Sequence, residues 1–303
     1  MKIGITVNVG LNSVTSTVYS ANPLKGCEKD ARAMFEIAKA RGFDMNLSKP
    51  PLLGAEATHE NVTKRVTEAA AVLKPGDLFF FSFAGHGTFK FLNSAEEEPD
   101  KRDESIVLTD HFMTDNYWRK ELWPKFKPGV RAIAIADCCH AETILFAQQI
   151  ERATRPDVAS VGIPGNLVAG ATWPFRAAGN PSVQSITPGL QPPAFRMITE
   201  AQGRKELEIF KAFYDKQDAA PAGEIGVSRL FLSACKDGQT AADGEDNGVF
   251  TAALLKVWDN GNFEGNYKDL MAKVGAQFAG TNQTPMFKQI GEPDVSSEKP
   301  FTI

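Results

Sequence analysis

Cysteine is scarce in this sequence of 303 residues, and neither sign of charge dominates it. The four cysteines stand at positions 27, 138, 139 and 235, in no CxxC arrangement. That spacing excludes a disulfide-rich secreted scaffold and the common zinc ribbons, so we expect reduced thiols that serve the core or chemistry. The net charge is -4 and no basic block is present, so nucleic acid is not expected as a partner.

Long hydrophobic runs are also missing. The longest, at 78–81 and 132–136, are far shorter than the roughly 20 apolar residues that cross a bilayer. Near the N-terminus, Asn8 and Gly10 interrupt the first apolar run too early for the core of a signal peptide, and no small-residue cleavage site follows. These features predict a cytoplasmic protein that does not associate with membranes.

The elements that are present alternate between short apolar runs and amphipathic segments, in a composition typical of globular proteins. This order favours an α/β fold with a central, mostly parallel sheet and helices on both faces. Continuous runs such as LFFFSF and AIAIA suit strands that are buried on both sides. The predicted strands are 2–9, 78–83, 132–136 and 229–233, and the predicted helices are 28–41, 59–73, 141–151, 194–215 and 249–258.

Two regions interrupt this alternation. Residues 90–104 are strongly charged and predict a loop, whereas residues 153–193 are rich in Pro, Gly, Ala and Ser and show little periodicity. We expect a single domain, 1–303, with a large insertion. Its parts are a catalytic portion at 1–152, an insertion or linker with a helix at 153–227, and a smaller portion at 228–303.

Reactive residues follow two of the predicted strands, at the edge where open α/β sheets bind ligands. The segment LFFFSFAGHGT places His86 between two glycines, and AIAIADCCHAET leads directly into Asp137, Cys138 and Cys139. In extended backbone, Asp137 and Cys139 point to one side and Cys138 to the other. A helix beginning after Cys139 would favour its thiolate. The pattern predicts Cys139 as a nucleophile and His86 as its base.

Five segments resemble, in the same order, motifs of the metacaspases and of their compact prokaryotic relatives, the orthocaspases. They are LKGCEKDA at 24–31, GDLFFFSFAGHG at 76–87, DESIVLTD at 103–110, ADCCHA at 136–141 and LSACKDGQTA at 232–241. The separation of His86 from Cys139 is also close to the roughly 50 residues typical of the caspase pair. The resemblance implies the caspase fold, a three-layer sandwich whose mostly parallel sheet lies between two helical layers.

The resemblance also implies a cysteine endopeptidase. Cys139 would attack the scissile carbonyl and form a thioester, and His86 would activate the thiol and protonate the leaving amine. The backbone N–H groups of Gly87 and Cys139 would form the oxyanion hole. No third residue that orients His86 is evident from the sequence.

Substrate preference follows from the residues that match the family's S1 pocket, which holds the side chain before the cleaved bond. These are Asp30, Asp137 and Cys27. Two carboxylates in a partly desolvated pocket pair best with a cation, so we expect peptide or protein substrates cleaved after Arg or Lys. Asp30 could instead be an exposed acid in the first turn of a helix, favoured by the helix dipole.

No cofactor is required for this chemistry, but many metacaspases use calcium as an activator. Asp103, Asp115 and Asn116 lie near the matching positions, although Asn116 stands where the family usually has a second carboxylate, which weakens a hard-cation site. The resemblance implies a monomer, and self-cleavage at basic residues of the insertion, for which Arg152, Arg155 and Arg176 are candidates.

Three other interpretations compete with this one. A catalytically silent caspase-like module would bind partners without cleaving them, and its usual signature would be loss of the Cys or the His. A legumain-, gingipain- or separase-like protease would share the two strand ends but not the segment around Asp30. A metal bound by Cys138, Cys139 and His140 is disfavoured because adjacent residues on a strand point in divergent directions.

Overall fold

The computed structural model describes residues 1–14, 18, 21–91, 102–139, 194–219, 221, 223–236 and 239–303, apart from the side chains of 89–91, 102, 103 and 200. Within these residues, six strands form the main sheet in the order β2-β1-β3-β7-β8-β9, in which only β9 runs antiparallel to its neighbour. The strands are β1 (Gly4–Gly10), β2 (Leu52–Leu53), β3 (Leu78–Ala84), β7 (Arg131–Asp137), β8 (Ser228–Ser233) and β9 (Met286–Ile290).

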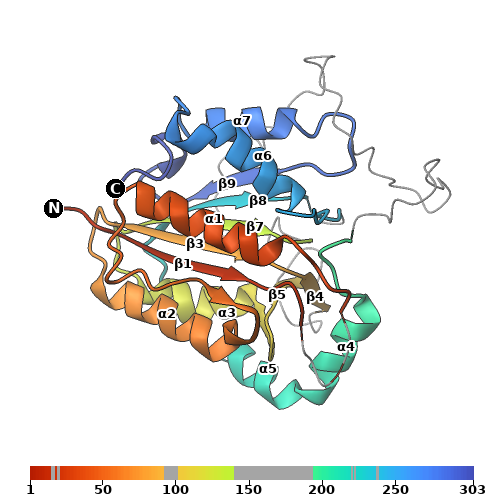
Figure 1. The fold of residues 1–303 in the computed structure, drawn as a ribbon. Helices are drawn as coiled ribbons and strands as arrows, with labels where there is room; N and C mark the ends of the chain where they lie inside the picture. The colour runs from red at the N-terminus through yellow and green to blue at the C-terminus, as the bar shows by residue number, and fades with distance from the viewer. Residues whose placement is uncertain are drawn as a thin grey trace, which may run out of the picture.

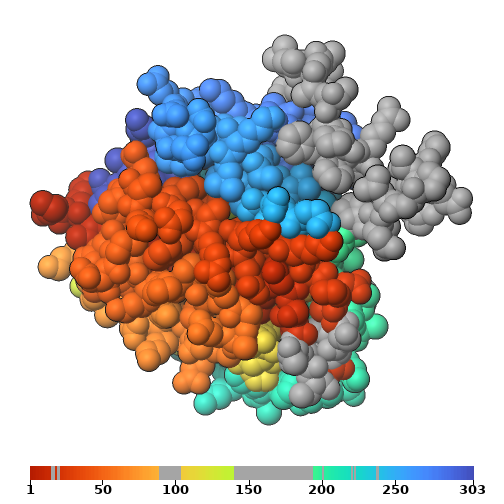
Figure 2. Space-filling model, in the orientation of Figure 1, coloured from red at the N-terminus to blue at the C-terminus, as the bar shows by residue number. Residues whose placement is uncertain are grey.

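Helices cover both faces of this sheet, as Figure 1 shows. One face carries α1 (Cys27–Ala40), α6 (Val249–Trp258) and α7 (Tyr267–Ala276). The other carries α2 (His59–Val72) and the short turns α3 (Asp115–Tyr117), η2 (Trp118–Leu122) and η3 (Trp123–Lys125). In Figure 2 the red and orange N-terminal elements and the blue C-terminal helices meet along one continuous surface. The predicted sandwich, a mostly parallel sheet between two helical layers, is therefore confirmed. In the described part of the chain, no helix is both long enough and apolar enough to cross a membrane.

The apolar run in β3 explains why both faces need a helical layer. Phe79, Phe81 and Phe83 pack into the core on the α2 side, whereas Leu78 and Phe80 pack on the α1, α6 and α7 side. Each of these five side chains is almost completely buried. Alternate residues of a strand point to opposite faces, so a continuous apolar run has no solvent-facing side.

The predicted strands of the main sheet agree with the observed ones to within two residues at each end. The helix predicted at 249–258 has the observed bounds, and α2 begins where expected because the Thr58 side chain accepts a hydrogen bond from the Asn61 N–H. The helix predicted at 141–151 and the stretch 153–193 lie outside the described residues.

The prediction of a loop over 90–104 is wrong at both of its ends. There β4 (Gly87–Phe91) and β5 (Arg102–Val107) pair antiparallel, and β6 (Phe112–Thr114) extends them to a three-stranded sheet. This small sheet lies beyond the carboxyl ends of the main strands (Figure 1). Strand pairing depends on a partner from elsewhere in the chain, so local charge was a poor guide to it.

The prediction of one helix over 194–215 is also wrong. Residues 194–199 are extended, α4 (Glu200–Ile209) begins after Thr199, and α5 (Lys211–Asp218) follows as a separate helix. Thr199 and Gln202 form a reciprocal capping box that fixes the start of α4. This Thr-x-x-Gln signal is present in the sequence and marks the boundary that the apolar periodicity alone did not.

His59, at the start of α2, is buried between the rings of Tyr117 and Phe213, whose centroids lie 4.5 Å and 5.3 Å from its own. Burial lowers the pKa of His59 to about 4, with His111 adding to the decrease and the Asp110 carboxylate opposing it. The folded protein therefore holds this imidazole neutral at pH values where an unfolded chain would protonate it.

The free energy of unfolding should consequently fall as the pH drops from about 6.5 towards 4. In that range the unfolded state binds a proton at His59, whereas the folded state does not. The loss from this group is at most about 3 kcal/mol. Urea unfolding at pH 7.5 and pH 4.5 should show a larger loss for the wild type than for His59→Gln, which has no proton to bind. Equal losses in the two proteins would contradict this prediction.

Candidate active site

The two strand ends that carry reactive residues are neighbours in the sheet. Strands β3 and β7 pair in parallel, and the register places Ala84 opposite Asp137. The chain therefore leaves the sheet through His86 on one strand and through Cys139 on the next, at the same rim. This is the arrangement that the sequence predicted for the two groups.

His86 is fully buried, and its Nε2 lies 2.8 Å from the carbonyl oxygen of Asn22. A carbonyl can only accept, so Nε2 carries the proton and Nδ1 of the neutral ring keeps its lone pair. Nδ1 makes no hydrogen bond of ordinary geometry within the described part of the chain. Burial lowers the pKa of His86, against the opposing effect of the Asn22 carbonyl. The ring is thus neutral, with Nδ1 available as a base.

Asn22 is the group that orients His86, and sequence reasoning did not identify it. The contact is made by a backbone oxygen, and every residue has one. The sequence therefore contains no signal that could have identified this contact.

Cys139 is fully buried in the core on the α1, α6 and α7 side, whereas Cys138 lies in the core on the opposite side of the sheet. The predicted alternation of these two side chains is correct. Because they point to opposite sides, the two thiols cannot ligate one metal ion together. His140, the third residue of that alternative, lies outside the described residues.

The expected thiolate at Cys139 is not the form that this structure favours. Its Sγ accepts a hydrogen bond from the Ala241 N–H at 3.1 Å. This contact lowers the pKa, but burial outweighs it, so the pKa of Cys139 is raised. Residues 140–193, where a helix was expected to favour the anion, are outside the described part. Burial therefore favours the thiol form of Cys139.

An extended stretch of the chain lies across the two strand ends, and we call residues 194–199 the cleft segment. Its backbone pairs on both sides, with bridges from Phe195 to Ala242 and from Met197 to Gly87. The Arg196 N–H donates to the Ala241 carbonyl at 3.0 Å. Such backbone pairing is typical of an extended peptide that binds to a protein as an additional strand.

The carbonyl oxygen of Arg196 accepts two hydrogen bonds, from the Gly87 N–H at 2.9 Å and from the Cys139 N–H at 3.2 Å. These are the two donors that the sequence predicted for an oxyanion hole. The backbone approaches so closely here that a Cβ on Gly87 would lie 2.0 Å from the Cys139 carbonyl oxygen. Only glycine leaves room for this arrangement.

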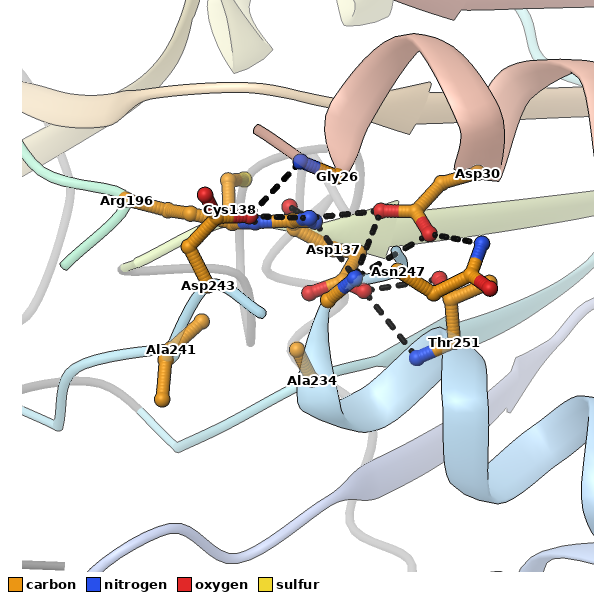
Figure 3. A network of polar contacts seen from close by, with 12 residues as sticks. Gly26, Asp30, Asp137, Cys138, Arg196, Ala234, Ala241, Asp243, Asn247 and Thr251 are labelled. Carbon is orange, nitrogen blue, oxygen red and sulfur yellow. Dashed lines mark hydrogen bonds and ion pairs between the residues drawn. The ribbon is translucent and has the colours of Figure 1, made fainter. Parts of the chain in front are cut away.

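The side chain of Arg196 is completely buried and is surrounded by three carboxylates (Figure 3). Its Nη2 lies 2.6 Å from Asp30 and 2.9 Å from Asp243, and its Nη1 lies 3.1 Å from Asp137. The structure therefore brings the two predicted acids together and adds Asp243, which sequence reasoning missed. Asp30 is 1% exposed, so the alternative of an exposed first-turn acid is wrong.

Backbone and hydroxyl groups hold these carboxylates in place. Asp30 accepts from the Gly248 N–H at 3.1 Å, and Asp137 accepts from the Thr251 hydroxyl at 2.7 Å. Asp243 accepts from the Lys25 N–H at 2.6 Å. Burial raises the pKa of Asp30 to about 6, although the nearby Arg196 guanidinium acts in the opposite direction. The pocket is thus an anionic site that a single cation only partly neutralises.

Two further residues shape this pocket. A Cβ on Gly248 would lie 2.5 Å from Cζ of Arg196, so this glycine makes room for the guanidinium. Cys27, predicted as part of the pocket wall, is buried in an apolar cluster with Leu24 and Ala84. Ala194 packs against that cluster, which places Cys27 beside the cleft segment.

The calcium site expected at Asp103, Asp115 and Asn116 falls only partly within the described residues. Asp115 and Asn116 are buried at the start of α3, and the Asn116 side chain already accepts a hydrogen bond from Arg119. The side chain of Asp103 is outside the described part. Among the residues that the structure describes, no group of three or more His, Cys, Asp or Glu side chains could hold a metal ion. The calcium site therefore stays a prediction.

Comparison with known proteins extends over nearly the whole chain. A model of the caspase domain matches residues 12–302. Metacaspase-1 of Mycosarcoma maydis is 26% identical over 239 residues, which cover 76% of this chain and 56% of that protein. Metacaspase III c of Phaeodactylum tricornutum is 30% identical over 153 residues, which cover 48% of this chain and 44% of that protein. The chain spans about half the length of these curated relatives.

Solved structures agree with this match. A crystal structure of a Geobacter sulfurreducens protein is 28% identical, covers 99% of both chains and has a TM-score of 0.74. The crystal structure of Caspase-1 from Spodoptera frugiperda has a TM-score of 0.51 at 12% identity, covers 99% of this chain and 91% of that chain, and shows likeness of fold alone. Because the caspase-domain model matches almost every residue, the chain belongs to the caspase-domain family of cysteine peptidases, with the metacaspases as distant relatives.

Proposed function

We propose that the protein is a cysteine endopeptidase that hydrolyses peptide bonds on the carboxyl side of Arg or Lys. The pose of Arg196 is the observation that carries this proposal. Its guanidinium lies among three buried carboxylates while its carbonyl oxygen faces the N–H groups of Gly87 and Cys139. A peptide held in this way places its basic side chain in the pocket. Its carbonyl oxygen then accepts a hydrogen bond from the backbone N–H of Cys139, the nucleophile.

The chemistry follows from the protonation states of the two reacting groups. His86 is neutral and Cys139 is a thiol, so Nδ1 takes the proton as sulfur attacks the carbonyl carbon. The negative charge that develops on oxygen meets two N–H donors. His86 then returns the proton to the leaving amine, and a water molecule hydrolyses the thioester to complete the cycle.

Charge explains the choice of a basic residue before the cleaved bond. The pocket contains three carboxylates, and burial makes each of them costly unless a cation pairs with it. An acidic side chain would add a fourth negative charge to the same dry space. The pocket is therefore matched to Arg, whose planar guanidinium reaches all three acids, and to Lys as a more compact cation.

Fluorogenic peptides ending in Arg, Lys or Asp, assayed with and without calcium, test this function. We expect cleavage after Arg and Lys, none after Asp, and a loss of at least about 1000-fold in Cys139→Ala and His86→Ala. Because the wild-type pocket holds Arg196, the assay should include Arg196→Ala. If neither the wild type nor a folded Arg196→Ala protein cleaves any basic substrate, the function is that of a non-catalytic binding module instead.

Asp243 provides a separate test of the pocket. Replacing one carboxylate by an amide of the same shape should lower kcat/KM for Arg substrates by roughly 10- to 100-fold, since a hydrogen bond between two charged groups is lost. Asp243→Asn can be compared with Asp246→Asn, because Asp246 is exposed and pairs with Lys29 at the surface. Equal kcat/KM in the two variants would show that Asp243 does not contribute to binding the basic side chain of the substrate.

Gly248 should control the size of the basic residue that is accepted. In Gly248→Ala the new methyl group would occupy space within 2.5 Å of the guanidinium, as the structure stands. We expect kcat/KM for Arg substrates to fall at least roughly tenfold through overpacking, and that for Lys substrates to fall less because Lys ends sooner. Parallel assays with Arg and Lys substrates measure this ratio. An unchanged ratio would show that the methyl group does not meet the substrate.

A further inference from the structure

We propose that Gln283 is a positioning residue for peptide cleavage, because its side chain holds the backbone that pairs with the substrate. That backbone is residues 241–243, which we call the pairing stretch. The inference rests on the proposed function and deepens it, since it concerns how the same site binds the residues before the cleaved bond. Gln283 lies in the loop between α7 and β9 and is only 6% exposed.

The pairing stretch runs antiparallel to the cleft segment and faces it with alternate backbone groups. The Ala241 carbonyl accepts a hydrogen bond from the Arg196 N–H at 3.0 Å. The Asp243 N–H donates to the Ala194 carbonyl at 2.8 Å. A substrate with its basic side chain in the pocket would make the same two bonds, through the residue before the cleaved bond and through the residue two positions earlier.

Ala242, the middle residue of the pairing stretch, is held from the other edge. Its N–H donates to Oε1 of Gln283 at 3.2 Å, and its carbonyl accepts from the Val249 N–H, at the start of α6, at 3.1 Å. Backbone groups of successive residues in extended chain point to opposite edges. The bonds to Gln283 and Val249 therefore fix one edge, and the substrate uses the other.

The second atom of the Gln283 amide is anchored to the main sheet. Its Nε2 donates to the carbonyl of Ala234, directly after β8, at 3.0 Å. One partner is a donor and the other an acceptor, so only one orientation of the amide satisfies both. The Gln283 N–H in turn donates to the Thr281 hydroxyl at 3.3 Å, which supports the loop. Gln283 thus ties the pairing stretch to the strand beside β7, the strand that leads into Cys139.

Three parts of the site depend on where the pairing stretch lies. Its backbone binds the peptide, and its Ala241 N–H donates to Sγ of Cys139 at 3.1 Å. The side chain of Asp243 is one of the three carboxylates around the Arg196 guanidinium. Reaction rates are sensitive to misplacement of binding groups by as little as about 1 Å. A residue that fixes this short backbone therefore acts on cleavage through Ala242.

Two substrates of different length separate this role from a purely structural one. Acetyl-Arg-aminocoumarin has no carbonyl at the position of Ala194, whereas acetyl-Ala-Phe-Arg-aminocoumarin has one and repeats the order of residues 194–196. A general loss of folded protein lowers kcat/KM for both substrates by the same factor. The ratio of the two values therefore reports on the additional contacts of the longer peptide.

Gln283→Met has nearly the length of glutamine but no amide, so it releases Ala242 from Ala234. We expect the ratio of kcat/KM, long substrate to short, to fall roughly 3- to 10-fold, as for the net loss of one hydrogen bond. The substitution is made in the wild type and in Arg196→Ala, so that residues 194–199 in the cleft do not mask the effect.

Gln289→Met is the matched control. Gln289 is a half-buried glutamine of β9 whose Nε2 donates to the Ser228 hydroxyl at 2.8 Å, at the opposite end of β8 from Ala234. Its loss should lower the temperature of unfolding but leave the ratio of the two kcat/KM values unchanged. A ratio that fell equally in Gln289→Met and Gln283→Met would overturn the inference.

The remaining outcomes separate this inference from the proposed function. A folded Gln283→Met protein with an unchanged ratio would overturn the inference alone. If Gln283→Met does not fold, Gln283→Asn keeps the amide but is one methylene too short to join Ala234 to Ala242, and an unchanged ratio there would overturn it equally. If both parent proteins that contain Gln283 cleave neither substrate, the proposed function fails, and this inference fails with it.

Discussion

The site depends on the placement of one buried guanidinium among three buried carboxylates. Burying a charge is costly unless it is paired, and here three acids on separate parts of the chain share a single cation. Asp30 comes from α1, Asp137 from the end of β7, and Asp243 from the loop before α6. The same contacts that satisfy the cation therefore also join the two ends of the sequence around the cleft.

The register of the central strands positions the reacting groups relative to this pocket. Because β3 and β7 are parallel neighbours, their carboxyl ends deliver the imidazole and the thiol to one rim, and alternation along β7 turns Asp137 and Cys139 to the same side. The pocket and the nucleophile are thus adjacent for a reason that lies in the geometry of a strand. A shift of β7 by one residue would exchange Cys139 for Cys138 and bury the reactive thiol on the wrong face.

Burial affects the site in two opposing ways. It strengthens the pairing of the cation with its carboxylates, since electrostatic interactions are stronger in a dry interior. It also keeps His86 and Cys139 in their neutral forms, which makes the resting site less reactive. The cleft, which residues 194–199 of the same chain fill, is consequently stable and has low reactivity. Both properties come from the exclusion of water.

The sequence by itself determined the layered α/β fold and the two strand ends with His86 and Cys139, because apolar runs and strand alternation are local properties. Its motifs also pointed to Asp30 and Asp137. Only the tertiary structure revealed Asp243, the Asn22 carbonyl, the small sheet of β4, β5 and β6, and the cleft segment that was expected to be helical. It also showed the burial that favours the thiol form of Cys139. Each of these features depends on burial or on contacts between distant parts of the chain. Burial and long-range contacts are not determined by the residues that are neighbours in the sequence.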